Sequence, residues 1–233
     1  MKSSTRRTIA LLLLVTSLLR VTACTTGPTG TAHLTPAPLS GEMALPPPAL
    51  VGEKSLEEVI ASRRSVREFT DQALSWSYLS QLLWSAQGMT DPGGLRTAPS
   101  AGALYPLKIY VALPDGAYHY LPPGHAVEPV SAGDLREDLW QAGLRQDALR
   151  QAPAIFVIAA VYERTEAKYG ERAERYVHLE AGHAAQNMLL QAVALELGAV
   201  PIGAFSDDLA QAALGLPADH RPLYLIPVGH PLE

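Results

Sequence analysis

Two short segments of this 233-residue chain carry residues suited to holding a flat, phosphorylated cofactor. The first is an arginine-rich segment, Arg63-Arg-Ser-Val-Arg67. The second follows about thirty residues later and is rich in small residues, Arg96-Thr-Ala-Pro-Ser-Ala-Gly-Ala-Leu-Tyr-Pro106. Guanidinium groups match phosphate oxygens two at a time, and segments without bulky side chains let the backbone approach a planar ring. The pair predicts an anion site beside a platform for an aromatic ligand.

In the arginine-rich segment, the candidate phosphate ligands are Arg63, Arg64, Ser65 and Arg67. The preceding Ser55-Leu-Glu-Glu58 has the pattern of a capping box and predicts a short helix that ends at about Arg63. The arginines therefore stand at or just past a helix C-terminus, where the helix dipole favours cations even without a ligand. A solvated helix end is the alternative to a phosphate site.

Two small-residue segments, Ala98–Ala103 and Val200–Phe205, could form the walls of a ring-binding site. Their exposed backbone amides and the Ser100 hydroxyl could donate hydrogen bonds to ring heteroatoms. An ordinary connecting loop is the alternative for the first segment, and a strand end or turn for the second. The candidate residues are Pro99, Ser100 and Ala101 in the first segment, and Gly203 and Ala204 in the second.

Lys168 and Tyr169 are the candidate groups for proton transfer. They follow a buried apolar run, and Arg164 and Arg172 flank them. Neighbouring cations favour the unprotonated, basic form of a lysine, so Lys168 could serve as a base. The alternative is a solvated helix surface.

Several other chemistries lack their motifs. The chain has neither G-x-G-x-x-G nor G-x-x-x-x-G-K-[ST], and Ser100 does not stand in G-x-S-x-G, which weakens dinucleotide, P-loop and serine hydrolase hypotheses. Glu180 and His183 could share a helical face, but a di-metal site needs a second such pair, so no metal site is predicted. The net charge of -5 and the lack of a basic run argue against nucleic acid as a partner.

The N-terminus has the pattern of an export signal. Basic residues precede an apolar run, Ile9–Leu19, that is too short to span a bilayer core of about 30 Å. Val21-Thr-Ala-Cys24 resembles the lipobox of bacterial lipoproteins and predicts lipidation of Cys24. An incidental cysteine in a plain secretory signal is the alternative. Thr5-Arg-Arg-Thr-Ile9 also loosely matches a twin-arginine signal, so the export route stays open.

These patterns divide the chain into three parts: a lipoprotein signal peptide over residues 1–23, a Thr/Pro/Gly-rich linker over 24–50, and one domain over 51–233. Cys24 is the only cysteine, so no intrachain disulfide can form. We expect an exported protein, anchored by lipid to the bacterial cell envelope on its periplasmic or extracellular face.

The apolar patterning of the domain predicts an α+β fold with helices packed on a mostly antiparallel sheet. Ala154–Val161 is apolar throughout and predicts a strand buried on both faces. A long helix from Ala173 to a stop at Gly198 is apolar around much of its circumference and should be central. Asp115-Gly116 predicts a tight turn with positive φ angles. The other expected elements are helices over 55–63, 76–87, 134–150 and 207–215, and strands over 108–113, 117–121 and 223–228.

The motif segments, taken in their order along the chain, resemble those of the nitroreductase-like flavoproteins. Among these proteins, they resemble the SagB-type dehydrogenases, which oxidise azoline rings in modified peptides. The matching stretches are Arg63–Phe69, Leu79–Gly88, Arg96–Pro106, Lys168-Tyr-Gly170, Leu179-Glu-Ala-Gly-His-Ala-Ala-Gln-Asn187, Val200–Phe205, Pro222–Tyr224 and Pro227–Gly229. They cover almost the whole domain. The resemblance implies a nitroreductase-like sandwich that binds FMN non-covalently at a homodimer interface.

The resemblance also implies roles for the candidate residues, and the three segments are then expected to converge around one ring. Arg63 and Ser65 would hold the phosphate, with Arg67 near N1 and O2 of the flavin. Pro99, Ser100 and Ala101 would line the ring, and the Gly203 amide would face N5. Lys168 and Tyr169 match the pair regarded as the base in azoline oxidation.

The expected function is that of an FMN-dependent oxidoreductase that transfers hydride through flavin N5 in a ping-pong cycle. Its substrate would be a small molecule or a peptide, with NAD(P)H as a candidate electron donor. Three alternatives stay open: an azoline dehydrogenase acting on a modified peptide, a non-catalytic flavin-binding lipoprotein, and a cofactor-free binding module.

Overall fold

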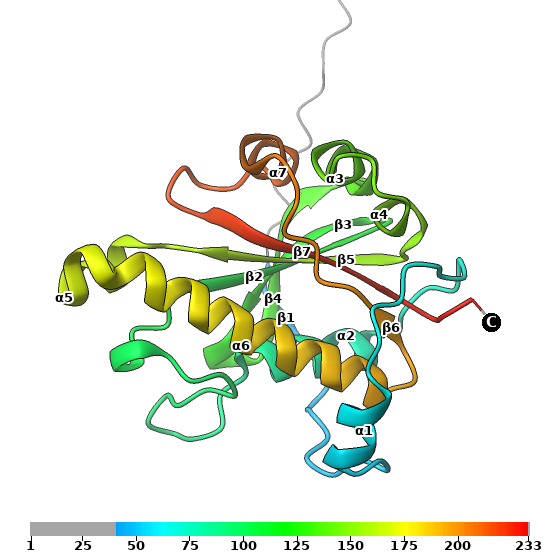
Figure 1. Ribbon diagram of the computed structural model, residues 1–233, viewed down its shortest axis with the longest axis horizontal. Coiled ribbons are helices and arrows are strands. Elements are labelled where there is room, and N and C mark those ends of the chain that lie inside the picture. The colour runs from blue at the N-terminus through cyan, green and yellow to red at the C-terminus, as the bar shows by residue number, and fades with distance from the viewer. Residues whose placement is uncertain (1–40, 233) are drawn as a thin grey trace, which may run out of the picture. The chain divides into compact units, whose positions relative to one another are not determined.

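A seven-stranded sheet forms the centre of the computed structural model, which describes residues 41–232 (Figure 1). Every neighbouring pair of its strands is antiparallel. The strands are β1 (Met43–Ala44), β2 (Leu107–Leu113), β3 (Gly116–Leu121), β4 (Ala126–Ala132), β5 (Ala154–Ala160), β6 (Gly198–Ala199) and β7 (Arg221–Gly229). They lie in the order β1-β4-β3-β2-β5-β7-β6.

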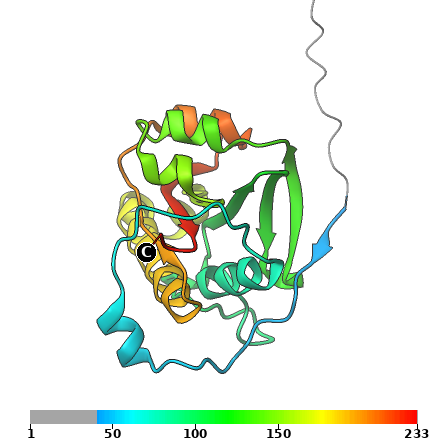
Figure 2. The same cartoon turned by 90° about the vertical axis from the view of Figure 1, so that its right-hand side faces the viewer.

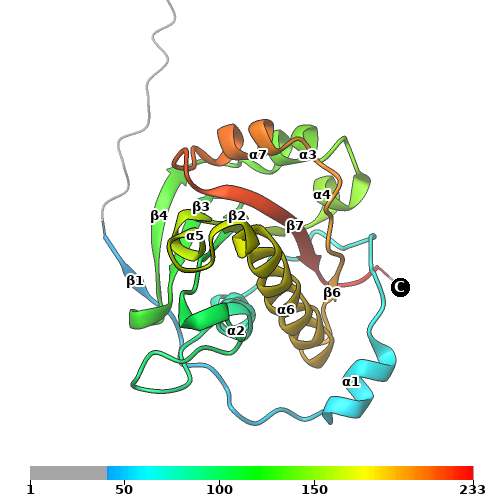
Figure 3. The same cartoon turned by 60° about the vertical axis from the view of Figure 1, so that its left-hand side comes forward.

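Helices cover both faces of this sheet (Figures 2 and 3). They are α1 (Leu56–Ser62), α2 (Trp76–Gln87), α3 (Arg136–Ala142), α4 (Asp147–Gln151), α5 (Glu163–Tyr169), α6 (Ala173–Ala194) and α7 (Asp207–Leu214), with 3₁₀ turns at Ala101–Ala103, Pro122–Gly124 and Gly170–Arg172. Helices α2 and α6 lie on one face, and α3, α4 and α7 lie on the other. The α+β prediction with a long central helix is therefore confirmed.

Strand β5 is the clearest link between sequence and core. All seven of its side chains are buried. Phe156 and Ile158 pack into the α2/α6 core, whereas Ile155 and Val157 pack into the α3/α7 core. A strand that feeds two cores needs apolar residues at consecutive positions, which is why this run shows no alternation.

Two predicted helix starts are confirmed in detail. At α1, the Ser55 hydroxyl accepts a hydrogen bond from the Glu58 amide, and the Glu58 carboxylate accepts one from the Ser55 amide. This reciprocal pair satisfies two amide donors that a helix start leaves open. At α2, Ser75 caps the first turn through the Tyr78 amide.

The predicted hairpin is present, but its turn differs from the expectation. Leu113 pairs with Gly116, so Pro114 and Asp115 are the two loop residues. Neither these two residues nor Gly116 has a positive φ angle. Proline fixes its own φ near −65°, so the turn that the Asp-Gly pair predicted is excluded at this position.

Other expectations about the elements were also wrong. Strand β4 was not predicted, because a charged residue and a proline interrupt its apolar pattern. The expected helix over 134–150 is divided into α3 and α4, because Leu144 and Arg145 adopt positive φ angles. Helix α6 ends at Ala194 rather than at Gly198, which belongs to β6. Helix α6 also exposes one face, Leu179 included, so it is not apolar all round.

The C-terminal part of the expected linker belongs to the domain. Met43 and Ala44 pair with β4, and Leu45 is buried. The Leu45 amide donates a hydrogen bond to the His125 carbonyl, and the Ser80 hydroxyl donates one to the Pro46 carbonyl. The predicted domain start at Val51 is therefore too late.

Residues 1–40, with the expected signal and Cys24, lie outside the described residues. None of the helices between residues 41 and 232 has the length and apolarity needed to cross a membrane.

Gly198 is needed where the arginine-rich segment meets the sheet. A Cβ at this position would lie 2.5 Å from Cγ1 and 2.7 Å from Cβ of Val66. We therefore expect Gly198→Ala to lower the free energy of unfolding by about 1–3 kcal/mol, because the backbone around Val66 must move. Urea unfolding measures this, with Gly52→Ala as the control, since a Cβ at Gly52 meets nothing within 4 Å. Equal stability of the two variants would contradict the prediction.

Candidate active site

The candidate phosphate ligands Arg63, Arg64, Ser65 and Arg67, here called the arginine group, follow α1 and lie against the sheet edge. Ser65 forms a parallel bridge with Ala199, and the Val66 amide donates a 3.1 Å hydrogen bond to the Ala199 carbonyl. A few residues later, the Ile202 amide donates a 2.8 Å bond to the Leu225 carbonyl. The chain then continues to Gly203 and Ala204, both exposed. The structure therefore anchors the arginine group and the second small-residue segment to the same edge of the sheet.

The members of the arginine group differ in what their side chains do. Arg64 Nη1 donates to the carbonyls of Ala61 and Arg63, at 2.9 and 2.8 Å, so it closes the end of its own helix. Arg63 is the C-cap residue and is half-buried. Arg67 makes a single long contact of 3.4 Å to the Ser65 carbonyl. Ser65 and Arg67 are exposed, so both side chains are accessible to a ligand.

Pro99, Ser100, Ala101, Lys168 and Tyr169, here called the platform group, meet at a tight turn. Its tip is Gly102, which has a φ of +64°. A Cβ on Gly102 would lie 2.8 Å from Lys168 Nζ and 2.9 Å from Tyr169 Oη, which shows how close the ends of both side chains come to the turn, and the positive φ favours glycine there. The structure thus brings the expected proton-transfer pair to the expected ring platform, although about seventy residues separate them in the chain.

Hydrogen bonds hold the platform loop in place. The Ser100 hydroxyl accepts a 2.9 Å hydrogen bond from the Tyr105 amide. Arg96 Nη1 donates to Gln87 Oε1 at 2.8 Å, and its guanidinium lies 4.4 Å from the centre of the Tyr105 ring. Asn187 of α6 donates a 3.2 Å bond to the Thr97 carbonyl. A loop with so many fixed points can present its backbone to a ligand with little loss of entropy.

Glu180 lies beneath this loop and was missed as a site residue. Its side chain is 2% exposed, and burial raises its pKa to about 7 although Ser100, Gln87 and Arg96 favour the charged form. Glu180 was expected to matter only as a partner of His183, but His183 is exposed whereas Glu180 is buried. A single carboxylate in an otherwise apolar stretch of helix was the available signal.

The arginine group and the platform group are far apart within one chain. Ser100 lies beside Glu180, in the first half of α6. The arginine group contacts Ala199, beyond the end of α6, and Lys54 Nζ just before α1 donates to the Val193 carbonyl. With a rise of 1.5 Å per residue, positions 180 and 193 are about 20 Å apart along the helix. The structure therefore does not bring the two groups around one ring within a single chain.

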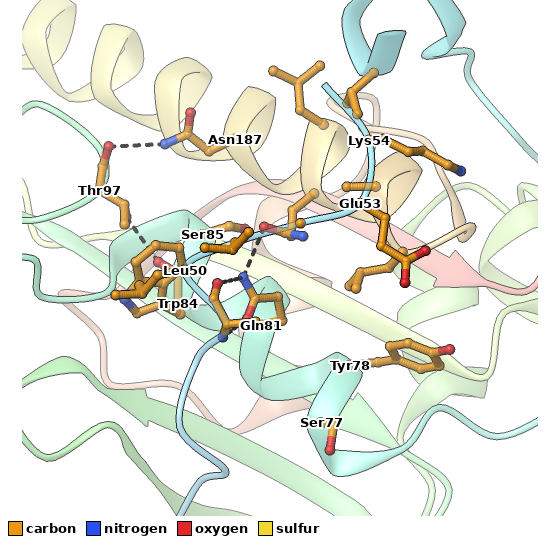
Figure 4. Close-up of a pocket in the computed structure, with 18 of the residues that line it drawn as sticks. Leu50, Glu53, Lys54, Ser77, Tyr78, Gln81, Trp84, Ser85, Thr97 and Asn187 are labelled. Atoms are coloured by element: carbon orange, nitrogen blue, oxygen red, sulfur yellow. Dashed lines mark hydrogen bonds between the residues drawn. The ribbon is translucent and has the colours of Figure 1, made fainter. Parts of the chain in front are cut away.

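A cavity of about 790 Å³ lies between α2, α6 and the segment that leads into α1 (Figure 4). The Gln81 amide exchanges hydrogen bonds with the backbone of Ala49 and donates a 3.1 Å bond to Gln191. Tyr78 and Trp84 line the cavity, as do Thr97 and Asn187 of the contact described above. None of the predicted site residues lines it. The cavity was not predicted, because part of its lining, between Pro46 and Leu50, lies in the segment that was expected to be a linker.

Comparison with known proteins decides the family. The model named "Nitroreductase family" matches residues 60–230, a stretch that contains both groups. "Putative nitroreductase MJ1384" of Methanocaldococcus jannaschii is 43% identical over 189 residues, which are 78% of this chain and 94% of that protein. The chain belongs to the nitroreductase family. The protein is thus a nitroreductase-family oxidoreductase.

Other relatives of this nitroreductase-family protein include a microcin B17-processing protein and a homologue in complex with FMN. The Escherichia coli microcin B17-processing protein McbC is 31% identical over 132 residues, 51% of this chain and 48% of McbC. The crystal structure of a "putative nitroreductase" from Ralstonia eutropha JMP134 has a TM-score of 0.76 at 32% identity, covering 86% of this chain and 96% of that one. A Desulfovibrio desulfuricans homologue in complex with FMN has a TM-score of 0.60 at 26% identity, and the match covers 78% of this chain and 88% of that one.

Proposed function

We propose that this protein is an FMN-dependent oxidoreductase that works as a homodimer. Each flavin would lie between the arginine group of one subunit and the platform group of the other. The observation that carries this proposal is that the two groups lie at opposite ends of α6, with Ser100 beside Glu180 and Ser65 bridged to Ala199, which leaves each subunit with two half-sites. The complex of a homologue with FMN supports the choice of cofactor.

The residues on the arginine-group side of the proposed site fit FMN. Ser65 and Arg67 are exposed, so a hydroxyl and a guanidinium are available to a phosphate or to the polar edge of the ring. Gly203 and Ala204 have no bulky side chains and are exposed, so their backbone can approach a ring. When bound, FMN supplies hydride transfer, which amino acid side chains cannot perform. The protein's own groups then position the ring and move protons.

The exposed face of α6 supports a dimer. Leu179 in this helix is 50% exposed, and His183 and Gln186 are exposed along the same face. Four further apolar side chains are more than half exposed in and before α1: Leu50, Val51, Leu56 and Ile60. Exposed apolar side chains of this number mark an interaction surface. A two-fold axis across α6 would place the end of one helix, and its arginine group, opposite the start of the other.

The experiment mixes two variants that are each expected to be inactive in one assay, the oxidation of an azoline-containing peptide. Arg67→Ala removes the arginine group's guanidinium, and Lys168→Ala removes the platform group's amine. After co-refolding, half of the dimers are mixed, and each mixed dimer holds one intact site and one doubly altered site, so about one quarter of wild-type activity should return. A matched mixture of Arg67→Ala with Ser65→Ala, which lie in the same half-site, should stay inactive. If neither mixture recovers activity while each variant is dimeric, the site is not shared.

A second candidate function is azoline dehydrogenation on a modified peptide. The observation that favours it is the contact of Lys168 and Tyr169 with the platform turn at Gly102, supported by the match to McbC. In this reaction Lys168 would take the proton from the substrate carbon. The Lys168 ammonium also lies 5.5 Å from the centre of the Tyr169 ring, so the two side chains can move together.

We also propose that the protein is exported and tethered to the cell envelope through lipid on Cys24. The support is the lipobox-like Val21-Thr-Ala-Cys24 after a signal-like apolar run. Stable anchoring requires more than one acyl chain, as a lipidated cysteine provides. Cys24→Ala should therefore move the protein from the membrane fraction of its cells to the soluble fraction. Membrane association that is unchanged in this variant would overturn the tether.

A further inference from the structure

A buried acid-amide pair, Glu180 and Gln87, lies directly under the platform loop. Glu180 and Gln87 are 2% and 0% exposed. Within the described residues, Glu180 Oε1 and Gln87 Nε2 both lack a hydrogen-bond partner. Unpaired polar atoms in a core are costly, so residues kept in this state need a reason other than stability.

The surroundings of Glu180 suit both of its protonation states. Burial favours the neutral acid, and this effect is the largest. Ser100 and Gln87 beside the carboxyl group, together with the charges of Arg96 and Arg164, favour the carboxylate. Arg96 is itself more than half-buried and bonded to Gln87, so its charge is fixed close by. A group balanced in this way can release and regain a proton near neutral pH.

Ser100 links this acid to the platform surface. Its oxygen accepts the Tyr105 amide, which leaves the hydroxyl proton free to point towards the Glu180 carboxyl group. Ser100 is half-exposed, and it stands between the exposed Pro99 and the half-exposed Ala101. The hydroxyl can therefore contact both the buried acid and a ligand on the platform. A serine in this position can pass a proton on without changing its own charge.

We propose that Glu180 is the proton store of the active site and that it delivers its proton to the bound substrate through the Ser100 hydroxyl. This inference rests on the proposed function. When a substrate accepts hydride, it also needs one proton. The Ser100 O–H bond breaks as that proton leaves, and the Glu180 O–H bond breaks as its proton replaces it on Ser100. The Glu180 carboxylate that remains is stabilised by Arg96 and regains a proton from solvent.

The kinetic test uses pre-reduced enzyme and 1,4-benzoquinone as the acceptor, which takes up hydride and one proton. The wild-type rate of flavin reoxidation should fall about tenfold per pH unit above pH 7, because the proton store empties. Glu180→Gln keeps the size and shape of the side chain but has no acidic proton to give. Its rate should therefore be at least about tenfold lower at pH 6, and its pH profile should show no change of slope near pH 7. The control is Glu174→Gln, an exposed acid on the same helix, which should behave as wild type. If the pH profile of the reoxidation rate still changes slope near pH 7 in Glu180→Gln, the proposal is overturned.

A second measurement separates this proposal from the proposed function. Infrared titration of flavin-free protein should show a carboxylic acid signal that disappears near pH 7 and is missing in Glu180→Gln. Ser100→Ala should keep this signal but lose the pH-dependent rate, because only the link is removed. If the protein does not bind FMN, the proposed function fails while the infrared titration still reports on Glu180. If no carboxyl group titrates near pH 7, the proton store is overturned whatever the flavin does.

Discussion

Replacing Lys168 with alanine should lower the rate of azoline dehydrogenation by about 10²–10⁴-fold, the usual contribution of a positioned acid-base group. The Lys168 amine lies against the platform turn, where a Cβ on Gly102 would be 2.8 Å away, so it stands beside the surface expected to hold the ring. Its removal takes away the group that accepts the substrate proton. Binding of FMN should be unchanged, because the lysine is exposed and no part of the fold depends on it.

The measurement is turnover of an azoline-containing peptide, with flavin content determined from absorbance in the same samples. Arg172→Ala is the matched control, since Arg172 is an exposed cation three residues beyond the Lys168-Tyr169 pair. The same variants should be assayed for quinone reduction, which needs no base to remove a proton from carbon. Loss of peptide oxidation with retention of quinone reduction would favour the dehydrogenase. Full peptide activity in Lys168→Ala would remove this residue from the mechanism.

The second large expected effect is a fall in the free energy of unfolding as pH rises, caused by the titration of Glu180. Burial raises the pKa of Glu180 from its ordinary 4.5 to about 7. Between these two values the folded protein keeps the proton that the unfolded chain has lost. The folded state therefore binds more protons, and the free energy of unfolding must fall as pH rises through this window. The loss from this one group should reach about 3 kcal/mol by pH 8, because each tenfold change in proton affinity is worth about 1.4 kcal/mol.

Glu180→Gln removes this titration while keeping a side chain of similar shape. We expect its stability relative to wild type to improve by about 3 kcal/mol between pH 4.5 and pH 8. Urea unfolding followed by tryptophan fluorescence at several pH values measures the difference. Glu174→Gln, at an exposed position of the same helix, should give a constant offset over this range. A constant offset for Glu180→Gln as well would show that its carboxyl group titrates normally in the fold.

Local patterns predicted those parts of the fold that depend on neighbours in the chain. The capping box at Ser55, the apolar run of β5 and the helix from Trp76 to Gln87 were all predicted, because each depends on residues within one or two turns or on simple burial. Strand β4 was missed because its pairing with β3 and β1, and not its own composition, makes it a strand. The residues before Val51 were missed for the same reason.

For the candidate site, the order of the motifs along the chain was enough to predict the residue types present and the family to which they belong. It placed arginines, small residues and a Lys-Tyr pair in segments that can hold a ring and move a proton. Only the tertiary structure decided their grouping. At Gly102 the platform loop turns beside Lys168 and Tyr169, whereas the arginine group lies at the other end of α6, bridged to Ala199. Burial raised the pKa of Glu180. The free-energy cost of charging a buried carboxyl group depends on the atoms around it, which no local sequence pattern encodes.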